Sequence, residues 1–171
     1  MRNLKEATLT RNRFASMTLA LLLALVGIVA ASAQDRPGYT QVPSDDPEMT
    51  EAKSKARATL VEFWSKLANP GPGEGGFALK VALPINATDR EHIWAINIER
   101  KNGKIFGVIS NEPVDLKTIK RGQRIEIAEN EISDWTYRRD GKIVGNFTMR
   151  PLLKRMPAKD AERYRAMLAD P

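Results

Sequence analysis

Residues 92–109 (HIWAINIERKNGKIFGVI) and residues 134–149 (DWTYRRDGKIVGNFTM) are the two stretches that decide the fold of this chain. Each places a two-residue turn signal between runs rich in β-branched and aromatic residues: Asn102-Gly103 in the first, Asp140-Gly141 in the second. Type I′ hairpin turns need positive φ at both central positions, which Asn, Asp and Gly tolerate. The sequence therefore predicts two antiparallel β-hairpins, the second returning through Ile143, Val144, Phe147 and Met149.

Each return strand carries a second glycine, Gly107 or Gly145, which favours a bulge or a close backbone approach. Residues 77–83 alternate apolar side chains with smaller or polar ones and end at Pro84, which predicts another strand. Residues 124–128 (RIEIA) predict one more. The expected sheet therefore has five to six antiparallel strands and is either strongly curved or a small open barrel.

Helices are predicted at both ends of this sheet. Asp46-Pro47-Glu48 is typical of a helix start, and the sequence after Asn69 breaks the helix with prolines and glycines. One apolar stripe at helical spacing joins these limits: Met49, Ala52, Ala56, Leu60, Phe63, Trp64 and Leu67. A second helix is predicted from Pro157 to Leu168. Strands flanked by helices indicate an α+β fold.

The first 33 residues have the features of a secretory signal peptide. A basic start precedes an uncharged apolar run over 14–30, and Ala31-Ser32-Ala33-Gln34 provides a cleavage site after Ala33. An uncleaved anchor is the alternative. We therefore expect a signal peptide at 1–33, a flexible leader at 34–46 and one domain at 47–171, located in the periplasm or secreted.

Export changes the meaning of the composition. Removing 33 residues from 171 leaves 138, and losing four basic and one acidic side chains lowers the net charge from +6 to +3. That modest charge, in an exported domain, argues against nucleic acid as a partner. The chain has no cysteine, which excludes disulfides, thiolate metal sites, a cysteine nucleophile and a lipoprotein anchor. We expect no metal and no cofactor.

Catalysis, if present, would depend on the single histidine. His92 could transfer protons near neutral pH, but it needs an orienting carboxylate, and Asp134 or Glu112 would have to supply it from another segment. Glu91 is unsuited, because neighbouring residues of a strand point to opposite faces. A structural histidine beside Trp94 is the alternative, and we commit to no catalytic residue.

Five residues are candidates for ligand binding: Trp94, Asn111, Trp135, Tyr137 and Arg150. The aromatic members of this set could line a groove or form the core of a small barrel. Two basic stretches, one over 117–124 and one over 138–142, could attract anionic lipid or wall polymer, or simply form a solvated face.

Several phrases of the chain resemble a known bacterial family. They are FW at 63–64, NPGPGE at 69–74, FALKV at 77–81, EHIW at 91–94, ISNEP at 109–113, KRGQ at 120–123, ISDWTY at 132–137, GK at 141–142, GNFT at 145–148 and RPLL at 150–153. This pattern is similar to the YegJ-like family of uncharacterised bacterial envelope proteins, a domain of unknown function. The resemblance implies a secreted or periplasmic protein and brings no activity and no catalytic residues.

The sequence favours a non-enzymatic domain that binds an envelope protein or polymer. A hydrolase acting on an envelope polymer through His92 with Asp134 or Glu112 is the first alternative. The second is a small inhibitor or immunity-like protein that acts through its hairpin tips.

Overall fold

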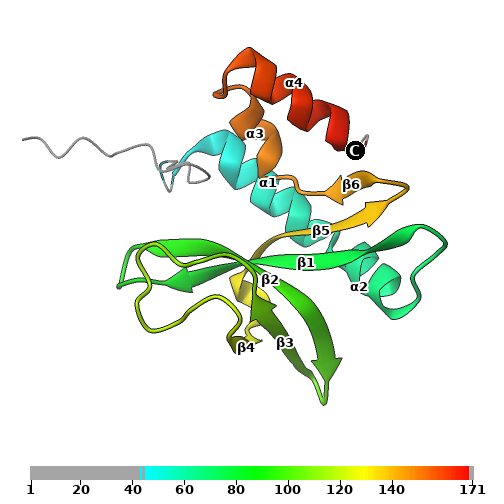
Figure 1. Ribbon diagram of the computed structural model, residues 1–171. Coiled ribbons are helices and arrows are strands. Elements are labelled where there is room, and N and C mark those ends of the chain that lie inside the picture. The colour runs from blue at the N-terminus through cyan, green and yellow to red at the C-terminus, as the bar shows by residue number, and fades with distance from the viewer. Residues whose placement is uncertain (1–42, 44, 170–171) are drawn as a thin grey trace, which may run out of the picture. The chain divides into compact units, whose positions relative to one another are not determined.

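A six-stranded antiparallel sheet forms the centre of the described chain (Figure 1). The computed structural model describes residues 43 and 45–169, so the predictions for residues 1–42, including the cleavage site, lie outside the described residues. The strand order is β4-β3-β2-β1-β5-β6. The strands are β1 (Glu74–Pro84), β2 (Arg90–Lys101), β3 (Lys104–Ile109), β4 (Arg124–Ile127), β5 (Ile132–Arg139) and β6 (Lys142–Gly145). The predicted α+β fold is confirmed, and its sheet is not closed.

Both predicted hairpins are present, β2–β3 and β5–β6. Their turn residues have positive φ throughout: 52° and 74° at Asn102 and Gly103, 51° and 78° at Asp140 and Gly141. Gly107 and Gly145 both lie where another chain segment approaches closely. The β2–β3 register shifts opposite Gly107, between the pairs Ile96–Val108 and Glu99–Phe106, whereas it is regular at Gly145.

The predicted N-terminal helix is two helices, α1 (Pro47–Ala58) and α2 (Leu60–Ala68). Asp46 caps α1 by accepting a hydrogen bond of 2.8 Å from the backbone N–H of Met49, as its position predicts. The single-helix prediction is wrong at Thr59. The hydroxyl of Thr59 donates to the Lys55 carbonyl over 2.8 Å, and side-chain bonding of this kind competes with the helical ladder.

The second hairpin also ends earlier than predicted. Phe147 and Met149 do not belong to the return strand, because β6 stops at Gly145 and Asn146 adopts a φ of 52°. The backbone then enters two further helices, α3 (Met149–Leu153) and α4 (Ala158–Met167), and only α4 was predicted. A short 3-10 helix, η1 (Glu129–Glu131), precedes β5. Beyond α4, Leu168 forms a parallel bridge with Ile143 of β6.

The main core lies between one face of the sheet and helices α1 and α2. Phe63 and Leu79 are fully buried there, and Trp135 donates its indole N–H to the Ala56 carbonyl over 2.9 Å. Because side chains alternate along a strand, the neighbours of Leu79 and Trp135 point to the opposite face. That second face carries the candidate site.

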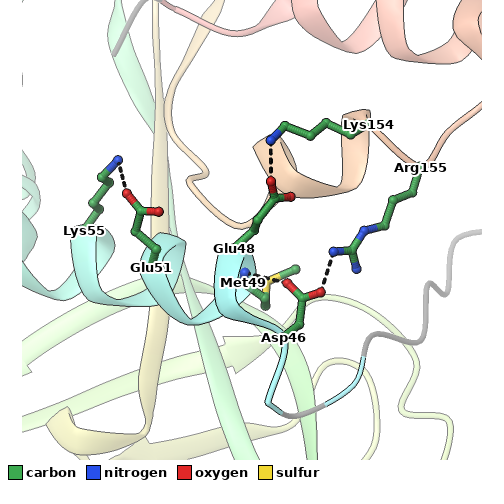
Figure 2. A network of polar contacts seen from close by, with 7 residues as sticks. All are labelled: Asp46, Glu48, Met49, Glu51, Lys55, Lys154 and Arg155. Atoms are coloured by element: carbon green, nitrogen blue, oxygen red, sulfur yellow. Dashed lines mark hydrogen bonds and ion pairs between the residues drawn. The ribbon is translucent and has the colours of Figure 1, made fainter.

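Ion pairs fasten the start of α1 to the segment after α3 (Figure 2). Lys154 pairs with Glu48, and Arg155 pairs with Asp46. The Met49 N–H and the Arg155 guanidinium lower the pKa of Asp46. Glu51 pairs with Lys55 one turn further along α1. The helices of the described residues include none that is long and apolar enough to cross a membrane.

Candidate functional site

A groove of about 290 Å³ lies on the face of the sheet opposite the main core. Four central residues of β1, β2 and β5 form its floor and one wall, since Ala78 pairs with both Ile96 and Thr136 while Trp94 lies across from Lys80. Arg138 of β5 and Asn111, just beyond β3, also line the groove. The groove is therefore mainly apolar at its base, with amide, hydroxyl and guanidinium groups around it.

Hydrogen bonds fix Trp94 and Asn111 side by side. The Asn111 side-chain oxygen accepts from the Trp94 N–H over 2.9 Å, and the Ser110 N–H donates to the Trp94 carbonyl over 2.8 Å. The Lys80 ammonium lies 5.1 Å from the centre of the Trp94 ring, a cation–π arrangement. Two of the five predicted ligand-binding residues thus meet in the groove.

Asn146 gives the groove an unused polar atom. Its side-chain oxygen is buried and accepts no hydrogen bond from the described residues. Buried polar atoms are nearly always paired in folded proteins. A ligand with an N–H or O–H group could therefore satisfy this oxygen without displacing another bond.

The other three predicted ligand-binding residues lie elsewhere. Trp135 and Tyr137 are buried on the core face, where Tyr137 stacks on Phe77 at 5.2 Å between ring centres. Arg150 of α3 donates to the Ala169 carbonyl over 3.1 Å and lines a smaller hollow beside α1. The structure does not bring any of them to the groove.

Asp134 is fully buried and accepts four hydrogen bonds. Its donors are the backbone N–H groups of Trp135, Phe147 and Thr148, and the Thr148 hydroxyl, at 2.6–3.1 Å. Burial raises the pKa of Asp134, and the hydrogen bonds from Thr148 and the charge of Lys80 oppose that rise. With both oxygens engaged, this carboxylate ties β5 to the start of α3, and it makes no hydrogen bond with His92.

His92 meets a hydroxyl instead of a carboxylate. Its Nδ1 lies 2.9 Å from the Ser133 Oγ, and that hydroxyl donates to the Lys80 carbonyl over 3.1 Å. The single Ser133 proton is thereby used, so we assign the proton of this contact to the His92 Nδ1. Ser133 is fully buried, which keeps its oxygen away from any substrate. Among the described contacts His92 has no orienting acid, and Glu112 lies exposed in the loop after β3.

Crowding of its ring by neighbouring atoms and, after it, the charges of Lys53, Lys80, Arg57 and Arg90 together lower the pKa of His92 from 6.5 to about 4. Between pH 6.5 and 4 the unfolded chain therefore binds more protons at this site than the folded chain. The stability that His92 contributes is present above pH 6.5 and is lost as the pH falls towards 4.

We predict that, as the pH is lowered from 6.5 to 4, the free energy of unfolding falls less in His92→Gln than in the parent chain. Urea unfolding at several pH values measures the free energy of unfolding of both chains. Carboxylates titrate in both chains, so their contribution cancels in the difference between the two free energies. At pH 8 the two curves should lie close together. Parallel pH dependences would contradict the assigned pKa.

Two positioning residues escaped the sequence reasoning. Glu91 is buried and accepts backbone hydrogen bonds from Val114, Asp115 and Leu116 at 2.6–2.9 Å, which holds the loop after β3 against β2. Lys80 donates to the Thr148 hydroxyl over 2.8 Å. The sequence contains one sign of the role of Lys80, because Lys80 is the charged residue within the apolar strand FALKVAL.

The described part of the chain contains no group of three or more His, Asp or Glu residues placed to hold a metal ion. This face offers apolar contact with Trp94 and Ile96, hydrogen bonding with amides and hydroxyls, and one cation, Arg138, at the edge.

Comparisons with known proteins place the chain in a family without assigning it an activity. Residues 46–169 match the family described as "Uncharacterized protein conserved in bacteria (DUF2314)". The chain is 41% identical over 93 residues to "Uncharacterized protein YegJ" of Escherichia coli (strain K12), covering 54% of this chain and 60% of that protein. It is 27% identical over 135 residues to "Putative ankyrin repeat protein NMB1133/NMB1171" of Neisseria meningitidis serogroup B, covering 75% of this chain and 53% of that protein.

These matches span between half and two thirds of the relatives' own lengths. No solved structure matches the chain at a significant level. The family model covers nearly all of the described residues, from the cap of α1 to the end of α4. The resemblance seen in the sequence is confirmed: the chain is similar to YegJ and belongs to the bacterial family DUF2314.

Proposed function

We propose that this protein is an exported, non-enzymatic domain that binds an extended, acidic peptide segment of another envelope protein in its groove. The observation that carries the proposal is the open sheet face, where Trp94, Asn111 and Arg138 from separate elements line one groove. The catalytic candidates Asp134 and His92 are meanwhile engaged in bonds within the fold.

The lining suits a peptide chain. Gly76 and Ala78 leave the floor low, so a backbone can approach the sheet closely. Trp94 and Ile96 offer apolar contact, and the unpaired oxygen of Asn146 offers an acceptor for a peptide N–H. The only charged side chain of this lining is Arg138, which favours a carboxylate on the ligand.

Export is part of the proposal and rests on the signal-like residues 1–33. Cleavage after Ala33 would release the domain into the periplasm or the medium. A domain without cysteine is compatible with an oxidising compartment, because it has no thiol to oxidise.

The proposal predicts a sharp difference between two neighbouring arginines. Arg138 lines the groove, whereas the next residue, Arg139, points to the other face of β5 and does not line it. The full chain, produced in its own bacterium and lightly crosslinked with formaldehyde, should retain a specific envelope protein through purification. We expect Arg138→Glu to reduce that protein at least tenfold and Arg139→Glu to retain it.

Two results would contradict the proposal. One is an empty purification under gentle crosslinking. The other is an equal loss of the retained envelope protein with both charge reversals, which would indicate unspecific attraction to a basic surface instead of specific binding in the groove.

A further inference from the structure

A second candidate site lies beside the groove, where basic side chains from three elements converge. We call it the basic cluster: Lys53, Arg57, Lys80, Arg90 and His92. Lys53 and Arg57 are four residues apart on α1 and therefore share one side of that helix. Lys80 comes from β1, and Arg90 and His92 come from β2, two residues apart and so on one face. These five residues are absent from the lining of the groove.

Contacts with the sheet backbone hold the cluster together. Arg57 donates its Nε–H to the Ile132 carbonyl over 3.1 Å, next to Ser133, whose hydroxyl contacts His92 at 2.9 Å. Arg90 donates to the Ala82 carbonyl over 3.3 Å, and Ala82 is the β1 partner of His92. Each guanidinium thus uses one N–H on the protein and keeps others for a ligand.

The electrostatic effects agree with this convergence. Lys53, Lys80, Arg57 and Arg90 all lower the pKa of His92, after the larger effect of the atoms that crowd its ring. Arg57 also lowers the pKa of Lys53, again after burial. Like charges that face one another in this way are costly unless an anion lies between them.

Two carboxylates of the described residues offset part of this charge, Asp46 at Lys53 and Asp134 at Lys80. Neither forms an ion pair with the cluster. The ion pairs of the described residues engage eight other cations, among them Lys154 and Arg155, and none of the four Lys and Arg residues of the cluster. Near the start of α1, Asp46 pairs with Arg155, Glu48 with Lys154 and Glu51 with Lys55 (Figure 2). Asp134, near Lys80, is fully buried with both oxygens engaged.

We propose that the basic cluster is a binding site for a phosphate group. A phosphate offers several acceptor oxygens and more than one negative charge, which suits two guanidinium groups, a lysine ammonium and an imidazole better than a single carboxylate does. Arg57, Arg90 and His92 are exposed and reach the ligand, whereas Lys80, bonded to Thr148, contributes its charge from behind. The phosphate group comes either from inorganic phosphate or from a phospholipid headgroup. This inference does not depend on the peptide groove.

The single histidine of the chain makes the test direct. The ¹H NMR signal of its imidazole is followed against pH in the full chain, at constant ionic strength, with sodium phosphate replacing sodium chloride. Bound phosphate should raise the pKa of His92 from about 4 by at least one unit, because it offsets the surrounding cations. Constant ionic strength separates this effect from screening.

Variants and vesicles complete the test. Lys53→Gln, which leaves the Arg57 contact intact, should weaken phosphate binding at least fivefold, and Lys53→Gln with Arg57→Gln at least twentyfold. Lys55→Gln is the matched control. Lys55 lies two residues after Lys53, on another side of α1, and pairs with Glu51, so this variant should bind phosphate as the parent does. Sedimentation with phosphatidylcholine vesicles, with or without phosphatidylglycerol, distinguishes the sources: retention only by the anionic vesicles, lost in the double variant, identifies a headgroup.

If phosphate raises the pKa of His92 but anionic vesicles do not retain the chain, the ligand is free phosphate. If phosphate leaves the His92 titration unchanged and anionic vesicles retain the parent and the double variant equally, the proposal is wrong. Melting temperatures of the variants show that a loss of binding does not reflect unfolding.

Discussion

Replacing Asp134 by alanine should lower the free energy of unfolding by about 3–5 kcal/mol, because it breaks a buried charged network by removing one partner. The variant would leave three backbone N–H groups and the Thr148 hydroxyl without their acceptor in the interior. It would also remove the anion that opposes the buried charge of Lys80, whose pKa burial already lowers. Urea unfolding of the full chain at pH 7 measures the loss.

Glu126 provides the matched control. Its carboxylate forms an ion pair of 2.9 Å with Lys104, a distance within the range of the Asp134 hydrogen bonds, but both side chains of the pair are more than half exposed. Exposed pairs contribute about 0–1 kcal/mol. We expect Glu126→Ala to stay within that range. Similar losses for the two variants would show that Asp134 does not hold the sheet to α3.

The second large effect is expected at Gly145. Its φ is 77°, and a Cβ built there would lie 2.5 Å from the Trp135 carbonyl oxygen and 2.6 Å from a carbon of the Trp135 ring. The left-handed backbone costs about 1–2 kcal/mol for alanine and the overpacking about 1–3 kcal/mol, so Gly145→Ala should lose about 2–5 kcal/mol.

Gly141 separates these two costs. It has almost the same φ, 78°, but nothing lies within 4 Å of a Cβ there. Gly141→Ala should therefore show only the backbone cost, about 1–2 kcal/mol. Chemical denaturation of both variants makes the comparison. Equal losses would mean that the backbone of β6 shifts away from Trp135 and that the close approach is not a fixed feature of the core.

Local signals in the sequence were sufficient to predict the sheet. The hairpins followed from Asn102-Gly103 and Asp140-Gly141, because few residue types tolerate positive φ at both turn positions. The break between α1 and α2 could not be predicted in this way, since the apolar stripe runs through it from Ala56 to Leu60. The end of β6 depends on a distant group, because the Asp134 carboxylate takes the N–H groups of Phe147 and Thr148.

The candidate site was partly predictable for a related reason. A hairpin with a known turn brings Ser110 and Asn111 close to Trp94, and the structure joins them by hydrogen bonds. Alternation predicts that Trp135 and Tyr137 share a face, but it does not say which face of the sheet the helices cover. The basic cluster needs the packing of α1 against β5, a long-range contact that no local pattern in the sequence contains.

The central claim, that the open sheet face binds a protein segment, is tested most directly by placing a photoreactive amino acid at one residue of the full chain in living cells. Position 96 lies in the groove and is 37% exposed as Ile96, whereas position 61, on α2, is 71% exposed as Val61. The account predicts that irradiation joins a discrete envelope protein to position 96, that Arg138→Glu abolishes this product, and that position 61 gives none despite its greater exposure. No product at position 96, or the same products at both positions, would contradict it.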